Sequence, residues 1–438
     1  MNVQRHISPF ESAYFREGGP LPLFDMPIFM GSAVRGAIDP GTAEEVLIRL
    51  AARHPLLRCR VVDGEEGHIL RLDGEFRPRV ETGEGGESAH LELVNSRPDW
   101  RNGLFQAHIL SDGEVSRIVL VIHHGVADGR SSFALLNEFW QCYTALAGGA
   151  ELPAVVERAL PDAIDARLAG VFKDDELDAL AVQMAAGAAA GGPGPVALPV
   201  DGVGRPRAGD DSPRFVIDRT EFDRETSAAV VAAARSHGIT VNGLVAGALM
   251  VAVREQLDLG PEPVPMVCGH AVDLRSRVTP ELTSEDVLNC VAGLLTPVEV
   301  SGDDRAADVG RKIHASLAAA LERGDAERFM LASLRATPDA LPPVPAPAPV
   351  PATEPVPMVS YGFSNVGRIA PHPTPEGVEF LRIEVSGNAP GMPPKLGSFT
   401  VDGRITLQNE YDSWVYDRDR MRRLIASVRG ALEKSLAC

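Results

Sequence analysis

The sequence predicts an α/β or α+β protein built from two halves, and three observations support this. Segments with helical spacing of apolar residues alternate with short runs rich in β-branched residues. A chain of 438 residues has room for two or three domains of ~150 residues, and 45% hydrophobic residues can fill their cores. A stretch rich in Gly and Pro near the middle predicts a linker at 196–212.

The first half, residues 1–195, is expected to mix helices and strands. TAEEVLIRLAAR (42–53) has helical spacing, and the His54-Pro55 pair ends that helix before a strand. A run of β-branched residues, RIVLVIHH, predicts a strand that ends in two histidines. In chain order the expected strands are LLRCRVV (56–62), 68–72, 104–110 and 117–124, and further helices are expected at 132–146 and 162–190.

The second half, residues 213–438, is expected to repeat this mixture. Its Pro-rich segment LPPVPAPAPVPATEPVP (341–357) cannot form a helix or a central strand, so it is expected to be an exposed insert. Helices are expected at 224–235, 241–256, 306–323 and 418–436. Strands are expected at 214–217, 264–274, 291–300, 358–363, 378–385, 396–401 and 404–411.

Composition excludes several classes of protein. Lys and Arg number 42 against 60 Asp and Glu, a formal charge of −18 that argues against nucleic acid as a partner. The apolar run at 239–253 is shorter than the ~20 residues of a membrane-spanning helix and is expected to be a core helix. The N-terminus shows no secretory signal, so we expect a cytoplasmic protein. Five scattered cysteines favour reduced thiols over a disulfide framework.

The stretch HHGVADG (123–129) is the strongest indication of chemistry. It follows the apolar strand, so the strand delivers the histidines to its end, and Gly125 and Gly129 permit a tight turn before the next helix. Adjacent side chains on a strand point to opposite faces, so one histidine alone can enter a given cleft. The ordinary pKa of a histidine side chain, ~6.5, suits a general base at neutral pH. Asp128 could orient that base or brace the turn.

Other interpretations of these residues can be compared. Both histidines could be ordinary core residues. A metal site is disfavoured because adjacent strand residues diverge, whereas metal ligands must converge. GFSNVG (362–367) places its second glycine one position too late for a serine-hydrolase elbow, and no phosphate-binding or dinucleotide-binding glycine motif is present.

HHGVADG also resembles the motif shared by the condensation-domain and chloramphenicol-acetyltransferase superfamily. Order, spacing and length most resemble the free-standing polyketide-associated acyltransferases, the phthiocerol dimycocerosyl transferase-like group. The DFGWG-type motif of several branches is not recognisable in this chain. Further stretches that resemble superfamily motifs are RHPLLRCRV (53–61), ITVNGLVAGAL (239–249), DLRSRV (273–278), Asn289 and YGFSNVG (361–367).

The resemblance implies two chloramphenicol-acetyltransferase-like subdomains, each a mixed β-sheet with flanking helices, in a V-shaped pair around a central channel. His124 would be the general base in that channel, and His123 would point away and pack. Asp128 and Gly129 would have supporting, structural roles, with Asp128 paired to Arg275 from the second half.

An acyl transfer builds an oxyanion that needs a hydrogen-bond donor. Ser360, Ser364 and Asn289 are the candidates, each with the alternative of an ordinary solvated or backbone-bonded side chain. The insert at 341–357 could gate the nearby channel or be a plain surface insertion.

The function implied by the resemblance is O-acyl transfer from acyl-CoA or an acyl carrier protein to a lipid, polyketide or sugar alcohol. Alternatives are a stand-alone condensation enzyme that forms an amide or ester between carrier-bound substrates, and an inert member that docks a carrier protein. We expect no bound cofactor, no metal, no nucleic acid, no transmembrane segment and a monomer. An acidic carrier would need a local basic surface. Two arginine clusters are candidates for it: Arg418, Arg420, Arg422 and Arg423, or Arg275 and Arg277.

Overall fold

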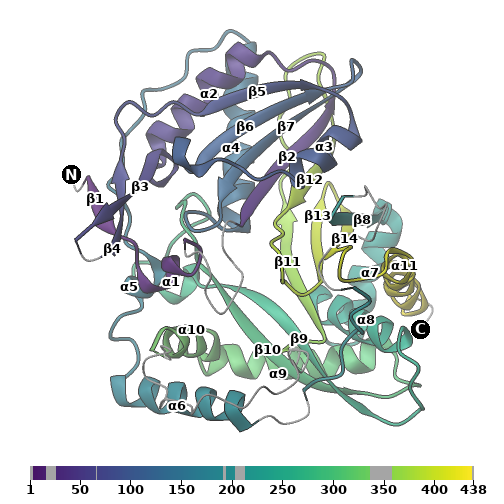
Figure 1. Cartoon of the computed structure of the whole chain (residues 1–438). Helices are drawn as coiled ribbons and strands as arrows, with labels where there is room; N and C mark the ends of the chain where they lie inside the picture. The colour runs from purple at the N-terminus through teal and green to yellow at the C-terminus, as the bar shows by residue number, and fades with distance from the viewer. Residues whose placement is uncertain are drawn as a thin grey trace.

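The computed structural model describes residues 3–15, 26–65, 67–190, 194–202, 213–335 and 358–436. These residues form a mixed α/β fold with two large sheets and flanking helices, which confirms the predicted class (Figure 1). The predicted insert at 341–357 and residues 203–212 of the predicted linker lie outside the described part of the chain. A small third sheet lies beside the first and consists of β1 (Gln4–His6), β4 (Gly67–Leu72) and β3 (Cys59–Gly64).

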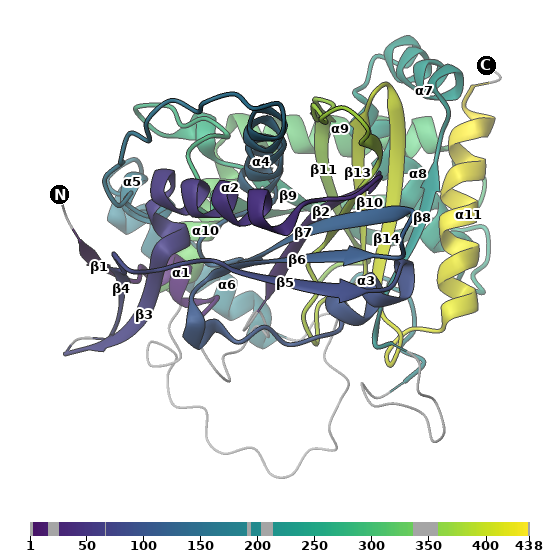
Figure 2. The same cartoon turned by 90° about the horizontal axis from the view of Figure 1, so that it is seen from above.

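The first large sheet carries the histidine motif on a central strand. Helices α2 (Pro40–Arg53) and α4 (Gly129–Ala147) pack on one face, and α3 (Glu87–Val94) packs on the other (Figure 2). The strand order is β12 (Glu379–Ser386), β2 (Pro27–Arg35), β7 (Val115–His123), β6 (Phe105–Ser111) and β5 (Arg79–Glu84), antiparallel except for the last pair.

The second large sheet is built from the later part of the chain. Helix α8 (Val241–Glu255) packs on it as the buried core helix that the apolar run at 239–253 predicted. Helices α7 (Arg224–Ser236), α9 (Ala306–Glu322) and α11 (Arg418–Lys434) join the same core. The strand order is β10 (Val291–Val300), β9 (Val264–Asp273), β11 (Tyr361–Ile369), β13 (Lys395–Val401), β14 (Arg404–Asp412) and β8 (Phe215–Glu221).

Among the described residues, no single helix is long and apolar enough to cross a membrane. Helices α7 and α8 pass that test together, by length and composition only, with a bend of 95° between them.

Strand β12 ties the two halves together. It comes from the second half, yet it pairs antiparallel with β2 at the edge of the first sheet. The first core also contains buried side chains from the second half, among them Leu274, Leu288 and Phe399. Strand β12, which lies after residue 212, is therefore part of the first sheet.

Several elements were not predicted from the sequence. The strand β2 is buried along almost its whole length, so it lacks the alternation of a half-exposed strand. The helix expected at 162–190 is two helices, α5 (Ile164–Arg167) and α6 (Asp174–Ala190). The other unpredicted elements are β1, α1 (Pro9–Ser12), β5, α3 and α10 (Asp325–Arg335).

Candidate active site

The turn after β7 places two histidines between the two halves of the chain. Strand β7 ends at His123, and the His124 N–H donates to the Met26 carbonyl at 3.0 Å. The Val126 N–H then donates to the His123 carbonyl at 3.0 Å, which closes the turn. Helix α4 begins at once, with Asp128 as its N-cap. The motif thus joins a buried strand end to a capped helix start.

His123 packs, as the sequence predicted. Its ring stacks on Phe15 at 4.3 Å between centroids, and Trp100 meets it edge-on at 5.0 Å. Its Nδ1 accepts a hydrogen bond from the Gly125 N–H at 3.0 Å. Burial, followed by the charge of His124, lowers the pKa of His123 to about 3. His123 is therefore a neutral, enclosed side chain at pH 7.

Gly125 is required by this packing. A Cβ at this position would lie 2.5 Å from Phe15 Cε2 and 3.0 Å from His123 Nδ1. The glycine lets the turn pass directly over the His123 and Phe15 rings.

His124 has a more open environment with two partners. The Tyr14 ring stacks on it, with centroids 5.0 Å apart and planes at 17°. The Asn289 amide Nδ2 lies 2.9 Å from the His124 carbonyl, to which it donates, and 3.2 Å from Nδ1. Asn289 Oδ1 accepts from the Val291 N–H at 3.2 Å, which fixes the orientation of the amide.

The contacts of the His124 ring lie on the side of Nδ1. Asn289 Nδ2 is 3.2 Å from Nδ1, and among the described residues Nε2 has no hydrogen-bond partner. Nε2 can act as a base when the single proton of the neutral ring is on Nδ1.

The surroundings of His124 keep it neutral. Burial is the largest cause that lowers its pKa, to about 4, and the charge of Lys395 lowers it further. The hydrogen bond to its own carbonyl and the charge of Asp128 oppose this shift. The imidazole is therefore unprotonated at pH 7 and able to accept a proton, although a low pKa makes it a weaker base.

Asp128 braces the turn with both carboxylate oxygens. Oδ1 accepts from the Ser131 N–H at 2.9 Å, and Oδ2 accepts from the Cys290 N–H at 2.8 Å. The Arg275 guanidinium donates to both oxygens, at 2.7 and 3.1 Å. Because Cys290 follows Asn289, this carboxylate holds the start of α4 and the partner of His124 in one arrangement.

Arg275 is the partner that the resemblance implied for Asp128. Although burial acts against its charge, the Asp128 carboxylate raises the pKa of Arg275 above its ordinary value. Loss of either member would leave a buried charge without its partner, at a cost of about 3–5 kcal/mol. Arg275 is only 3% exposed, so it cannot serve in the basic docking cluster proposed with Arg277.

The proposed α11 cluster is also largely engaged within the chain. Arg420 pairs with Asp201 at 2.8 Å, Arg422 with Asp419 at 3.3 Å, and Arg418 donates to the Pro213 carbonyl.

Gly129 lies at the start of α4 and lines a cavity of about 410 Å³. A Cβ on Gly129 would meet nothing within 4 Å. The predicted oxyanion candidate Ser364 lines the same cavity, with His270 and Asn242 from the second half. Burial lowers the pKa of His270 to about 4. The cavity therefore opens beside the helix start that follows His124.

The structure separates the three oxyanion candidates. Ser360 is 2% exposed; its hydroxyl donates to the Val196 carbonyl and accepts from the Val267 N–H. A hydroxyl has one hydrogen to donate, so that of Ser360 is already used. Asn289 contacts His124 directly, and its amide Nδ2 donates to the His124 carbonyl.

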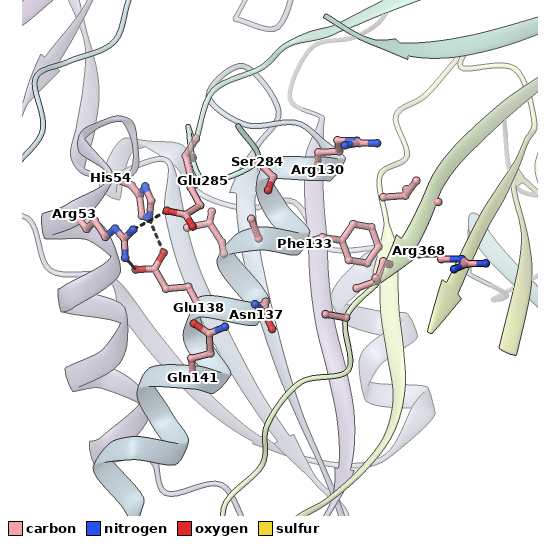
Figure 3. A pocket seen from close by; sticks show the side chains of 17 residues that line it. Arg53, His54, Arg130, Phe133, Asn137, Glu138, Gln141, Ser284, Glu285 and Arg368 are labelled. Carbon is pink, nitrogen blue, oxygen red and sulfur yellow. Dashed lines mark hydrogen bonds and ion pairs between the residues drawn. The ribbon is translucent and has the colours of Figure 1, made fainter. Parts of the chain in front are cut away.

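A second cavity, of about 370 Å³, lies farther along α4 (Figure 3). It shares Arg130 and Val366 with the first cavity, so the two adjoin. Glu138 in its lining contacts His54 at 2.8 Å and Arg53 at 3.0 Å. Phe133 and Asn137 of α4 and Arg368 of β11 also line it (Figure 3).

No group of three or more His, Cys, Asp or Glu side chains in the described ranges could hold a metal ion.

Two residues at the site were missed from the sequence. Tyr14 follows α1, a helix whose Ser8–Glu11 capping box was a readable signal. Lys395 comes from the start of β13, and its sequence surroundings carry no signal for this position.

Known proteins share the sequence pattern over most of the chain. Residues 211–408 match the family described as the C-terminus of phthiocerol/phthiodiolone dimycocerosyl transferases. The transferase of that name from Mycobacterium leprae is 25% identical over 357 residues, which cover 78% of this chain and 80% of the relative. The Mycobacterium ulcerans transferase is 24% identical over 356 residues, which cover 80% of this chain and 78% of that relative.

Solved structures share the fold at low identity. Polyketide synthase associated protein 5 from Mycobacterium tuberculosis superimposes with a TM-score of 0.69 and 17% identity, over 98% of this chain and 96% of that one. Trichothecene 15-O-acetyltransferase from Fusarium sporotrichioides has a TM-score of 0.68 and 14% identity, over 93% of this chain and 91% of that one. The first condensation domain of the CDA synthetase has a TM-score of 0.66 and 15% identity, over 94% of this chain and 91% of that one. The resemblance that HHGVADG indicated is confirmed: the chain is an acyltransferase similar in sequence to phthiocerol/phthiodiolone dimycocerosyl transferases, and it shares its fold with an acetyltransferase and a condensation domain.

Proposed function

We propose that the protein transfers an acyl group from an acyl-CoA or acyl-carrier-protein thioester to a hydroxyl of a lipid, polyketide or sugar acceptor, with His124 as general base. The observation that carries this proposal is the state of the His124 ring. Asn289 lies 3.2 Å from Nδ1, no described residue bonds to Nε2, and the low pKa keeps the ring neutral at pH 7.

The reaction follows from that free nitrogen. Nε2 takes the proton of the acceptor hydroxyl as its oxygen bonds to the thioester carbon, and the carbonyl electrons move onto oxygen. The C–S bond then breaks, and the leaving thiolate takes the proton back from His124. A positioned base of this kind typically contributes ~10²–10⁴ in rate.

The surroundings of the turn support a substrate-binding role for the neighbouring space. The two adjoining cavities run beside α4 from Gly129 to Gln141 and are lined by both halves of the chain. Apolar side chains such as Val272, Leu317 and Phe363 line the cavity beside Gly129 together with polar groups. Such a mixed lining suits a ligand with a hydrocarbon part and a few hydroxyl or amide groups. The relatives are named for transfer to phthiocerol or phthiodiolone, which favours a lipid acceptor.

Product analysis tests the proposal. The protein is mixed with a panel of acyl thioesters, presented on CoA and on a phosphopantetheinylated carrier protein, and with alcohols and amines. Mass spectrometry should detect a new ester that needs both substrates and the protein.

Each outcome separates the proposal from its alternatives. An amide formed from an amine, with no ester, would favour a condensation enzyme. Binding of the carrier protein with no product from any pair would favour an inert docking member, and either result would overturn O-acyl transfer.

A further inference from the structure

The acyl transfer proposed above needs a hydrogen-bond donor or a positive group for its oxyanion, and two of the three predicted candidates are engaged within the protein. The hydroxyl hydrogen of Ser360 is used on the Val196 carbonyl. Asn289 Nδ2 donates to the His124 carbonyl. Ser364 lines the cavity beside Gly129, and a charged group beside His124 is a further candidate to face the carbonyl oxygen of the thioester.

Lys395 lies at the same end of the first sheet as His124. Its Nζ donates to the Gly387 carbonyl, directly after the end of β12. A Cβ built on Gly387 would lie 3.8 Å from Lys395 Nζ and 3.2 Å from Met26 Cε. Met26 in turn accepts the backbone N–H of His124 at 3.0 Å. This chain of contacts brings a lysine of the second half beside the strand end that carries the base.

The ammonium group of Lys395 is held by two partners and has a third N–H donor. Its second partner is Glu410, with Nζ and Oε2 3.5 Å apart, and the Lys395 side chain is 20% exposed. A lysine has three N–H donors, and among the described residues the structure gives it these two partners. One donor is left for a substrate atom.

Glu410 is itself fixed by the sheet. The Gln408 amide donates to its Oε1 at 2.7 Å, and the Gly387 N–H and Ser386 hydroxyl donate to its Oε2 at 3.2 and 3.1 Å. Three hydrogen bonds thus hold the carboxylate, and it positions the lysine with less reorganisation than a flexible surface side chain would need.

We propose that Lys395 is a catalytic residue that stabilises the oxyanion formed when the acceptor attacks the thioester carbonyl. This inference rests on the proposed function. As the new C–O bond forms, the negative charge on the former carbonyl oxygen is met by the ammonium group, and it returns to the C=O bond as the thiolate leaves. His124 acts on the acceptor proton, and Lys395 acts on the acyl carbonyl.

The test compares Lys395→Met with Glu410→Gln, using the thioester and alcohol from which the wild-type enzyme makes ester. Lys395→Met removes the charge and should lower kcat by about 10²–10³-fold, with KM changed by only a few-fold, as for the loss of one oxyanion donor. Glu410→Gln removes the carboxylate that holds the lysine but keeps the ammonium group, so it should lower kcat by less than Lys395→Met does.

Chemical restoration separates charge from shape. Lys395→Cys alkylated with 2-bromoethylamine regains an ammonium group and should recover most of kcat, whereas Lys395→Cys alkylated with iodoacetamide should not. The identically treated wild type controls for the other cysteines. If Lys395→Met does not fold, Lys395→Gln, which can still donate to Gly387, should show the same loss.

Wild-type turnover by Lys395→Met or Lys395→Gln would overturn the inference while the proposed function stands. An equal loss in Glu410→Gln would also overturn it, because the ion pair and not the charge would then matter. If the wild-type enzyme makes no ester, the proposed function fails first.

Discussion

The two ends of the HHGVADG turn differ in how completely their hydrogen bonds are used. At the Asp128 end, the carboxylate accepts from two backbone N–H groups and from both sides of the Arg275 fork. At the His124 end, Asn289 contacts Nδ1 of the ring, and no described residue bonds to Nε2. Saturated contacts suit a brace, and an unused lone pair suits chemistry.

The same contrast separates the adjacent histidines. His123 lies between Phe15 and Trp100 and is 3% exposed, while His124 is partly exposed beside Tyr14. Both have lowered pKa values because of burial, so charge state alone does not distinguish a structural histidine from a reactive one. Enclosure does.

The largest expected effect on stability lies at the Asp128 end. Arg275→Ala should lower the free energy of unfolding by about 3–5 kcal/mol, since it strands a buried carboxylate. Denaturant melts measure this. Arg130→Ala, which removes an exposed ion pair with Asp273, should cost at most about 1 kcal/mol. A fully stable but inactive Arg275→Ala would show that this end takes part in the chemistry.

A smaller loss of stability should follow Gly125→Ala. The new methyl group would press on Phe15 and His123, and overpacking of this kind costs about 1–3 kcal/mol. Gly129→Ala is the matched control within the same motif, because its methyl group meets nothing within 4 Å. Thermal melting of the two variants should separate them. Equal stability would mean that the His123 side is not tightly enclosed.

The pH dependence of stability should reveal the enclosed histidine. The pKa of His123 is about 3 in the folded chain, and an unfolded histidine has ~6.5, so unfolding takes up a proton between these values. The contribution is complete above pH ~6.5 and is lost as pH falls towards about 3, with a slope of up to ~1.4 kcal/mol per pH unit.

Unfolding free energies between pH 7 and 5.5 measure that slope. His123→Gln should lower the slope by up to ~1.4 kcal/mol per pH unit, while His68→Gln, at an exposed position, should leave it unchanged. An unaltered slope in His123→Gln would contradict the burial argument.

The smallest effect is expected at the side chain that positions His124. Asn289→Ala removes one hydrogen bond to the His124 carbonyl, worth about 0.5–1.5 kcal/mol, so kcat should fall roughly 2–10-fold. Steady-state kinetics measure this, with the exposed Asn102→Ala as control. A loss as large as that of the base itself would make Asn289 part of the chemistry and not its support.

The sequence was sufficient for the parts of the molecule that follow local patterns. Helices with apolar spacing, such as α2 and α8, and the strand that ends at His123 were predicted within a few residues. The partnership of Asp128 with Arg275 came from the family resemblance and is present in the structure.

The pairing of strands that lie far apart in the chain could not be predicted from the sequence. No local pattern states that β12 crosses to the edge of the first sheet. The lysine beside His124 depends on that crossing, because Gly387, directly after β12, holds Lys395. Ser360 and Ser364 were grouped by even spacing, but hydrogen bonding to the neighbouring backbone uses the hydroxyl of Ser360.

The most direct test of the central claim is the kcat/KM of His124→Ala, measured at pH 7 with the thioester and alcohol that the wild-type enzyme converts. Loss of the base should lower kcat/KM by at least ~10²-fold, and the melting transition should stay unchanged because the ring carries few of the contacts that hold the turn. Turnover close to that of the wild-type enzyme would contradict the account.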